Sequence, residues 1–437
     1  MTTRQRLFVM MALQFFIWGA WLPLIFGYLP SLGFSPGQQS LILNAFPVAS
    51  IVGMFFSNQW ADRSSSPERV LALSHLVAGL AILGCGFTRS FLPFFLLMLV
   101  HCLLYVPTIS ITNSIAFANM KNPDKEFGIV RMGGTFGWIL AAWPFTFIFV
   151  NWDAVSAVQT TGFVNWIGTA LANPLVGDAA KAATRWTFIV AWLASLALAA
   201  YSLTLPKSAA AAKPKSASGG ADSQAWVVAF KLLKQPFILV LWLVTLVDAF
   251  VHNCYFNWTG VFLGTARESG GVGIASNWIA PIMSIGQVTE ILTMFILGAT
   301  LKRLGWKVTM IVGILGHAGR FAVYALFPES AAMIIGIQIL HGICYAFFFA
   351  TVYIFVDAYC PKDIRASAQG LFNLQILGIG ALLANSICPW LIQSVYTVDG
   401  LTDFRGLFMV PMVIASLGAL GLAFWFRPPM DRPAEVA

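Results

Sequence analysis

Apolar residues run through this chain in stretches that are long enough to cross a lipid bilayer. A helix of about 20 apolar residues spans a hydrocarbon core of roughly 30 Å, and such stretches recur along the whole sequence. The pattern therefore predicts an all-α integral membrane protein with about twelve transmembrane helices. They are expected near residues 7–29, 39–60, 69–88, 91–118, 128–150, 186–205, 235–264, 274–300, 306–327, 330–357, 364–394 and 406–427.

A low-complexity segment separates these spans into two sets. The stretch PKSAAAAKPKSASGGADSQ is small, polar and basic, which is typical of a flexible linker. We therefore expect an N-terminal six-helix half over 1–205, a cytoplasmic linker over 206–225 and a C-terminal six-helix half over 226–437. Residues 151–185 should form an outer loop of the first half. Two such halves can rock against each other around a central binding site, as alternating access requires.

Composition and charge agree with a membrane protein and disfavour other classes. The 437 residues are 59% hydrophobic and only 10% charged, which is more apolar than an ordinary soluble domain. A net charge of +8 would fit a nucleic-acid binder only if Lys and Arg gathered on one soluble face. Most of them instead fall in alternate loops, so the positive-inside rule places both termini in the cytoplasm. The six cysteines lack CxxC spacing, which disfavours disulfides and zinc.

The stretch MSIGQVTEILTMF places two polar residues in the middle of an apolar helix. Gln287 and Glu290 are three residues apart and therefore share a helical face. A carboxylate at the bilayer centre costs roughly 2.5–3.5 kcal/mol, and burial favours the protonated form of a carboxyl. Glu290 could thus carry a proton and hydrogen-bond a substrate hydroxyl, while Gln287 offers both a donor and an acceptor. A structural role, in which Glu290 ties two helices together, stays open.

Further polar and aromatic residues lie inside other spans. Asp248 and His252 are one turn apart, so they could pair with each other, or either could carry a proton. Trp138, Phe256 and Tyr345 would offer flat faces to a planar ligand, at roughly 1–3 kcal/mol for each stacked base. His75 and His101 are expected to be packing residues.

The loop after the second span resembles the major facilitator loop pattern, in which acidic and basic residues latch the cytoplasmic side. It reads NQWADRSSSPERV, and Asp62, Arg63 and Arg69 would form the latch. Ser64 stands where that pattern has a glycine. Alternatively, these are ordinary loop charges.

Over nearly its whole length the chain resembles the nucleoside:proton symporters of the major facilitator superfamily, which include bacterial nucleoside and xanthosine permeases. The resemblance is carried by LQFFIWGAWL, YVPTISITNSI, VRMGGTFGW and LTLP, and most specifically by IMSIGQVTE and IRASAQG. It implies that Ala346 replaces an Asp found in family members. The substrate-binding positions that it implies are Arg131, Thr135 and Trp138 in the fifth helix, Asn253 and Phe256 in the seventh, Gln287 and Glu290 in the eighth, and His341 and Tyr345 in the tenth.

The resemblance implies proton-coupled uptake of nucleosides across the bacterial inner membrane by alternating access. Glu290 would carry the proton, with Asp248 as a second candidate, and no cofactor besides the coupling proton is expected. The partners would be a small-molecule substrate and the bilayer, with no nucleic acid, and the protein would act as a monomer. Because Ala346 removes a carboxylate, a sugar or another small polar metabolite remains an alternative substrate. A non-transporting membrane sensor is a further alternative, whereas no motif indicates an enzyme.

Overall fold

The computed structural model describes residues 1–53, 66–120, 123–206, 230–360 and 365–428. Within these residues, nine helices are long and apolar enough to cross a membrane. They confirm the prediction of an all-α membrane fold. The predicted linker 206–225 lies outside the described residues except for its first position, and so does the end of the span expected at 39–60. The division into halves at that linker stays a prediction.

Packing divides the chain into two compact units, which are described separately. The first consists of the described residues of Met1–Ala212, Phe256–Gln287 and Asp399–Thr402. Its helices before the linker region are α1 (Thr3–Ser31), α2 (Pro36–Leu43), α4 (Pro67–Cys85), α5 (Phe91–Asn119), α6 (Pro123–Ala142), α7 (Phe145–Ile148), α8 (Trp152–Ser156), α9 (Phe163–Ala172), α10 (Gly177–Ala183) and α11 (Trp186–Ser202).

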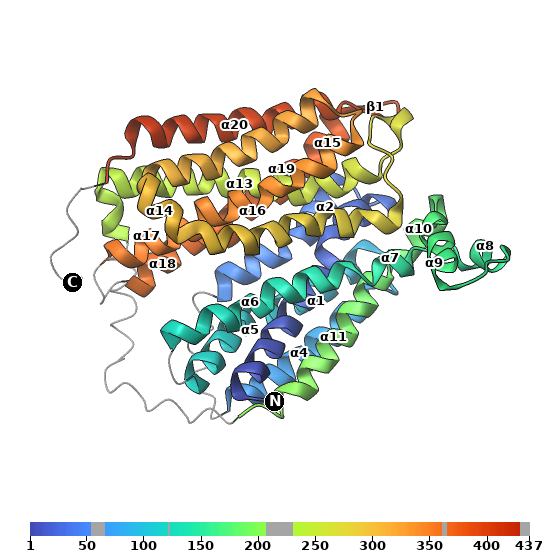
Figure 1. Ribbon diagram of the computed structural model, residues 1–437, viewed down its shortest axis with the longest axis horizontal. Helices are drawn as coiled ribbons and strands as arrows, with labels where there is room; N and C mark the ends of the chain where they lie inside the picture. The colour runs from blue at the N-terminus through green and yellow to red at the C-terminus, as the bar shows by residue number, and fades with distance from the viewer. Residues whose placement is uncertain (54–65, 121–122, 207–229, 361–364, 429–437) are drawn as a thin grey trace. The chain divides into compact units, whose positions relative to one another are not determined.

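The core of the first unit is a bundle of α1, α4, α5, α6 and α11, which lie side by side in Figure 1. The closest approach is between α1 and α6, at the small residues of VRMGGTFGW. A Cβ atom on Gly137 would overlap the carbonyl oxygen of Ala12, and one on Gly133 would lie 2.5 Å from that of Phe8. Because no side chain separates the two backbones, small residues here allow the close packing that membrane helices use in place of a hydrophobic drive.

The region expected to form an outer loop, 151–185, contains the three short helices α8, α9 and α10. It is fastened to the beginning of α14, which belongs to the same unit. Ser276 donates a hydrogen bond to the carbonyl of Leu175 at 2.7 Å, and Asn277 donates one to the carbonyl of Leu171 at 3.1 Å. The region is therefore an ordered part of the first unit.

The second unit consists of the described residues of Lys213–Tyr255, Val288–Val398 and Asp403–Ala437. Two long helices, α13 (Pro236–Gly264) and α14 (Ser276–Leu326), begin in one unit and end in the other. The other elements after the linker region are α15 (Ala331–Gly336), α16 (Leu340–Cys344), α17 (Thr351–Tyr359), α18 (Arg365–Asn373), α19 (Gly380–Trp390), α20 (Phe404–Trp425), the short strands β1 (Thr397–Val398) and β2 (Leu401–Thr402), the 3₁₀ turns η1 (Leu232–Lys234), η2 (Arg267–Ser269) and η3 (Ile337–Ile339), and the π-helical segments η4 (Tyr345–Ala350), η5 (Leu374–Ile379) and η6 (Leu391–Val395).

The segment labelled α14 contains two of the predicted spans, 274–300 and 306–327. The two helical parts meet at a kink at Gly305. This residue has φ = 70° and ψ = 177°, a conformation that is open to glycine and strained for other residues. In the second unit, a Cβ on Gly342 of α16 would overlap the backbone of Thr289 and Glu290 in α14. The backbones of α14 and α16 are therefore in direct contact at the predicted carboxylate.

Candidate functional site

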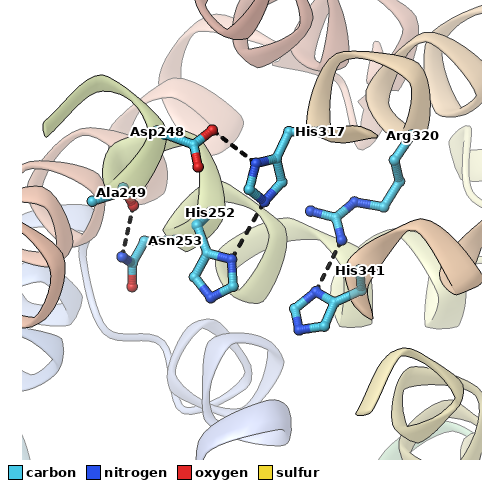
Figure 2. Close-up of polar contacts among 7 residues, drawn as sticks. All are labelled: Asp248, Ala249, His252, Asn253, His317, Arg320 and His341. Carbon is cyan, nitrogen blue, oxygen red and sulfur yellow. Dashed lines mark hydrogen bonds and ion pairs between the residues drawn. The ribbon is translucent and has the colours of Figure 1, made fainter. Parts of the chain in front are cut away.

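Asp248 and His317 form a buried hydrogen bond in the second unit. The carboxylate Oδ1 of Asp248 on α13 is 2.8 Å from Nδ1 of His317 on α14, and both side chains have no exposed surface. Figure 2 shows the two side chains pointing toward each other from their separate helices. The other carboxylate oxygen, Oδ2, has no hydrogen-bond partner among the described residues. The carboxylate thus depends on His317 for its one described hydrogen bond.

A second imidazole extends this contact. Nε2 of His317 is 3.4 Å from Nδ1 of His252, so His317 stands between Asp248 and His252 (Figure 2). The two residues that are one turn apart on α13 are therefore joined through a third residue, which lies on another helix. A neutral imidazole can donate a hydrogen bond from one ring nitrogen and accept one on the other. His317 can therefore bond to Asp248 and to His252 at the same time.

An arginine lies on the other side of the histidines. Nη1 of Arg320 is 3.0 Å from Nδ1 of His341, and its guanidinium carbon is 4.0 Å from the centre of the Tyr255 ring. The side chain has no exposed surface, and Nε and Nη2 have no hydrogen-bond partner among the described residues. The ring of His341 stacks on that of His252, with 5.2 Å between the ring centres. A fixed positive charge is thereby placed beside the imidazoles.

We call the five side chains Asp248, His252, His317, Arg320 and His341 the histidine cluster. It gathers three of the five histidines of the chain between one carboxylate and one guanidinium. Within a low-dielectric interior such charges interact far more strongly than in water. A chain of imidazoles in this setting can bind a proton on one ring and pass it to the next.

Tyr345 and Ala346, which follow His341 on the tenth predicted span, begin the π-helical segment η4. The ring of Tyr345 lies 6.4 Å from that of His252, centre to centre. Ala346 is fully buried and packs in an apolar cluster with Leu297 and Phe347. The position at which family members are expected to carry an acidic residue is therefore apolar in both composition and surroundings.

The first unit holds an aromatic group that contains the fifth-helix candidates. The indole of Trp138 meets the ring of Trp18 edge-on at 5.2 Å and that of Phe256 at 6.2 Å. The guanidinium of Arg131, also on α6, lies 4.2 Å from the centre of the Phe15 ring. Thr135, one turn after Arg131, is half-buried. These side chains form a polar and aromatic face of the first unit.

The eighth-helix pair divides between the units, since Gln287 belongs to the first and Glu290 to the second. The side chain of Gln287 is buried, and that of Glu290 is half-buried. Asn253 on α13 turns its amide onto its own helix and donates to the carbonyl of Ala249 at 2.8 Å (Figure 2). Its side chain therefore has a structural partner in this conformation.

The latch residues are only partly covered by the structure. Asp62 and Arg63 lie outside the described residues. Arg69 is exposed in the first turns of α4.

His75, expected to be a packing residue, is fully buried and hydrogen-bonded to the neutral side chains of Gln14 at 2.9 Å and Ser195 at 3.2 Å. It has the satisfied environment of a structural histidine.

His317 and Arg320 are the residues that sequence reasoning did not single out. They are three apart and share one face of α14, and an arginine inside an apolar span is costly unless it has a role. That spacing was a usable signal. Among the described residues, no group of three or more His, Cys, Asp or Glu side chains is arranged to hold a metal ion.

Comparisons with known proteins agree with one another. The family model described as "Nucleoside H+ symporter" matches residues 1–171 and 152–431. In Escherichia coli (strain K12), the putative nucleoside transporter YegT is 28% identical over 98% of this chain and 94% of its own length. Xanthosine permease from the same organism is 26% identical over 98% of this chain and 96% of its own.

The fold of this chain also matches a solved structure. The crystal structure of the nucleoside transporter NupG superposes with a TM-score of 0.79 at 22% identity, and the match covers 98% of this chain and 100% of that one. The crystal structure of a D-xylose–proton symporter superposes with a TM-score of 0.67 at 13% identity, over 97% of this chain. These likenesses show that the chain has the major facilitator fold.

Proposed function

We propose that this chain, which belongs to the nucleoside H⁺ symporter family, takes up nucleosides across the bacterial inner membrane together with protons, by alternating access. The observation that carries the proposal is the family match, which extends from residue 1 to residue 431 and so includes nearly every membrane helix. The polar and aromatic side chains inside the helices give this function its chemistry. We further propose that the protein works as a monomer with both termini in the cytoplasm.

The substrate contacts follow from the chemistry of each side chain. Trp138 and Phe256, whose ring centres lie 6.2 Å apart, would each offer an aromatic surface to the nucleobase. Gln287 and Glu290 would hydrogen-bond the ribose hydroxyls. The remaining proposed contacts are Arg131, Thr135, Asn253, His341 and Tyr345.

A proton gradient gives this cycle its driving force. One proton that moves inward through a membrane potential of 100 mV releases about 2.3 kcal/mol, which corresponds to roughly fifty-fold accumulation of the substrate. Glu290 is proposed to carry this proton at the substrate, because a half-buried carboxyl can bind it and hydrogen-bond a hydroxyl in the same step. Without coupling, uptake would stop at equal concentrations.

The test is uptake of labelled uridine and adenosine into proteoliposomes, with and without an inward proton gradient. Wild type should accumulate at least one of the two nucleosides only when the gradient is present. Glu290→Gln should lose accumulation, because the amide cannot take the proton. The matched control is Glu268→Gln, which makes the same change at an exposed residue and should behave as wild type.

Two results would contradict the proposal in different ways. Gradient-independent uptake in wild type would show a nucleoside carrier without proton coupling. Failure of wild type to take up either nucleoside, together with gradient-driven uptake of a sugar such as xylose, would move the substrate class to sugars. The buried Ala346 makes that second outcome the one to examine first.

A further inference from the structure

We propose that the histidine cluster is a proton-binding site that couples the conformational cycle of the second unit to the proton gradient. The inference rests on the proposed function, and it adds to Glu290 a second proton carrier, in a cluster that includes the proposed substrate contact His341. Asp248 and His317 would hold the proton, and His252 would exchange it. Arg320 and His341 would set the charge of the site.

The geometry provides a continuous hydrogen-bonded path. Asp248 Oδ1 and His317 Nδ1 are 2.8 Å apart, and His317 Nε2 and His252 Nδ1 are 3.4 Å apart. The path connects α13 to α14, and the ring of His341 on α16 stacks on that of His252 beside it. Since each step crosses between helices, movement of one helix would make or break the path.

The surroundings favour a proton carrier over a static ion pair. A structural Asp–Arg pair would be joined directly by the paired hydrogen bonds that guanidinium and carboxylate geometry allows. Here the described partner of Asp248 is His317, and that of Arg320 is His341. Asp248 Oδ2 and two Arg320 nitrogens have no hydrogen-bond partner among the described residues. The charges are thus held apart by imidazoles, each of which can accept on one nitrogen and donate from the other.

Three phenols and one thiol also lie near the cluster. Phenols and thiols lose their protons at higher pH in water than imidazoles do. These groups are Tyr255 on α13, Tyr324 on α14, Cys344 on α16 and Tyr345 in η4.

Protonation changes one bond and one charge. An incoming proton forms an N–H bond on His252 or His317, and the carboxylate of Asp248 stabilises the resulting imidazolium. The cluster then carries one more positive charge beside Arg320, which is costly in a closed interior. A conformation that hydrates the cluster becomes favoured, and there the N–H bond breaks and the proton passes to water. Proton binding and helix movement are linked in this way.

The experiment measures proton movement and substrate exchange separately in proteoliposomes. Nucleoside is added outside, and a pH-sensitive dye records the proton influx that accompanies it. Exchange of labelled for unlabelled nucleoside is measured at equal pH on both sides, where no net proton movement is needed. The variants are Asp248→Asn and His317→Asn. At position 317, the Asn side chain keeps a hydrogen-bond donor near the place of the His317 Nδ1 atom. The matched control is Asp153→Asn in α8, at an exposed position.

In both variants, the proton influx and the gradient-driven accumulation should be at least about tenfold lower than in wild type. The rate of nucleoside exchange should stay within about threefold of wild type. The control should match wild type in both assays. Wild-type proton influx in a variant would overturn the proposal, and so would equal loss of influx and exchange in correctly inserted protein, which marks a structural role. If Asp248→Asn does not insert, His317→Asn decides the question by itself. Absence of both activities in wild type would instead refute the proposed function.

Discussion

Asp248 and His317 lie 69 positions apart in the sequence, and Asp248 Oδ1 is 2.8 Å from His317 Nδ1. Neither side chain has any surface exposed to solvent. Removal of one partner from a buried pair costs about 3–5 kcal/mol, because the other charge is left without compensation. His317→Phe should therefore lower the thermal unfolding temperature of the detergent-purified protein strongly. The double variant Asp248→Asn with His317→Phe should lose less stability than the two single variants added together. Strict additivity would show that the two groups do not interact.

The contact between α1 and α6 leads to a second prediction. Gly137→Ala should destabilise the first unit by at least about 1–3 kcal/mol, since the new methyl group would overlap the backbone of Ala12. The control on the same helix is Gly128→Ala, because a Cβ there has no neighbour within 4 Å. That change should be neutral or slightly stabilising, as alanine is the better helix former. Thermal unfolding of both variants tests this, and equal unfolding temperatures would contradict the close contact.

The contact between α16 and α14 predicts an effect on transport. Gly342→Ala would push against the backbone at Thr289 and Glu290, and would displace the carboxylate proposed to carry the proton. A displacement of about 1 Å at a working group can reduce activity on the order of a hundredfold, so we expect the initial rate of uptake to fall at least about tenfold. Gly336→Ala serves as the control, because a Cβ there meets nothing within 4 Å. Unchanged uptake by the Gly342 variant would separate Glu290 from transport.

The aromatic group of the first unit predicts a change in substrate affinity. Trp138→Ala should raise the KM for nucleoside about fivefold to 150-fold, which corresponds to the loss of roughly 1–3 kcal/mol of base stacking. Trp138→Phe should recover most of the affinity because it restores a flat face. Trp425→Ala controls for loss of a tryptophan, since that residue is 67% exposed on α20. An unchanged KM in Trp138→Ala would remove this residue from the binding site.

The membrane helices could be predicted from the sequence because each is defined by a local excess of apolar residues. The close helix packing at Gly133 and Gly137 could also be predicted, because it follows from the small size of these residues. The histidine cluster could not be assembled in this way. Asp248, His317 and His341 lie on three helices, and no periodicity within one helix indicates which residues of another helix it faces. The sequence offered only the cost of each buried charge, which marks a residue without naming its partner.

The π-helical segment η4 interrupts the helical periodicity of the tenth span. Its hydrogen bonds reach five residues back instead of four, and the hydroxyl of Thr351 likewise donates to the carbonyl of Ala346, five residues earlier, at 3.1 Å. Residues after η4 therefore do not continue the 3.6-residue pattern of the residues before it. A helical projection that starts at His341 and assumes a regular α-helix is therefore out of register from Thr351 onward.

The same segment determines where the chain tolerates a change in length. In an α-helix, deletion of one residue turns everything beyond it by about 100°, so the buried faces on either side no longer match their neighbours. Between Tyr345 and Ala350 the wider turn already contains one residue more than an α-helical turn requires. Loss of one residue there would convert the turn to α-helix and leave α16 and α17 on their present faces. In this span, the chain can therefore become one residue shorter without a change in the orientation of α16 relative to α17.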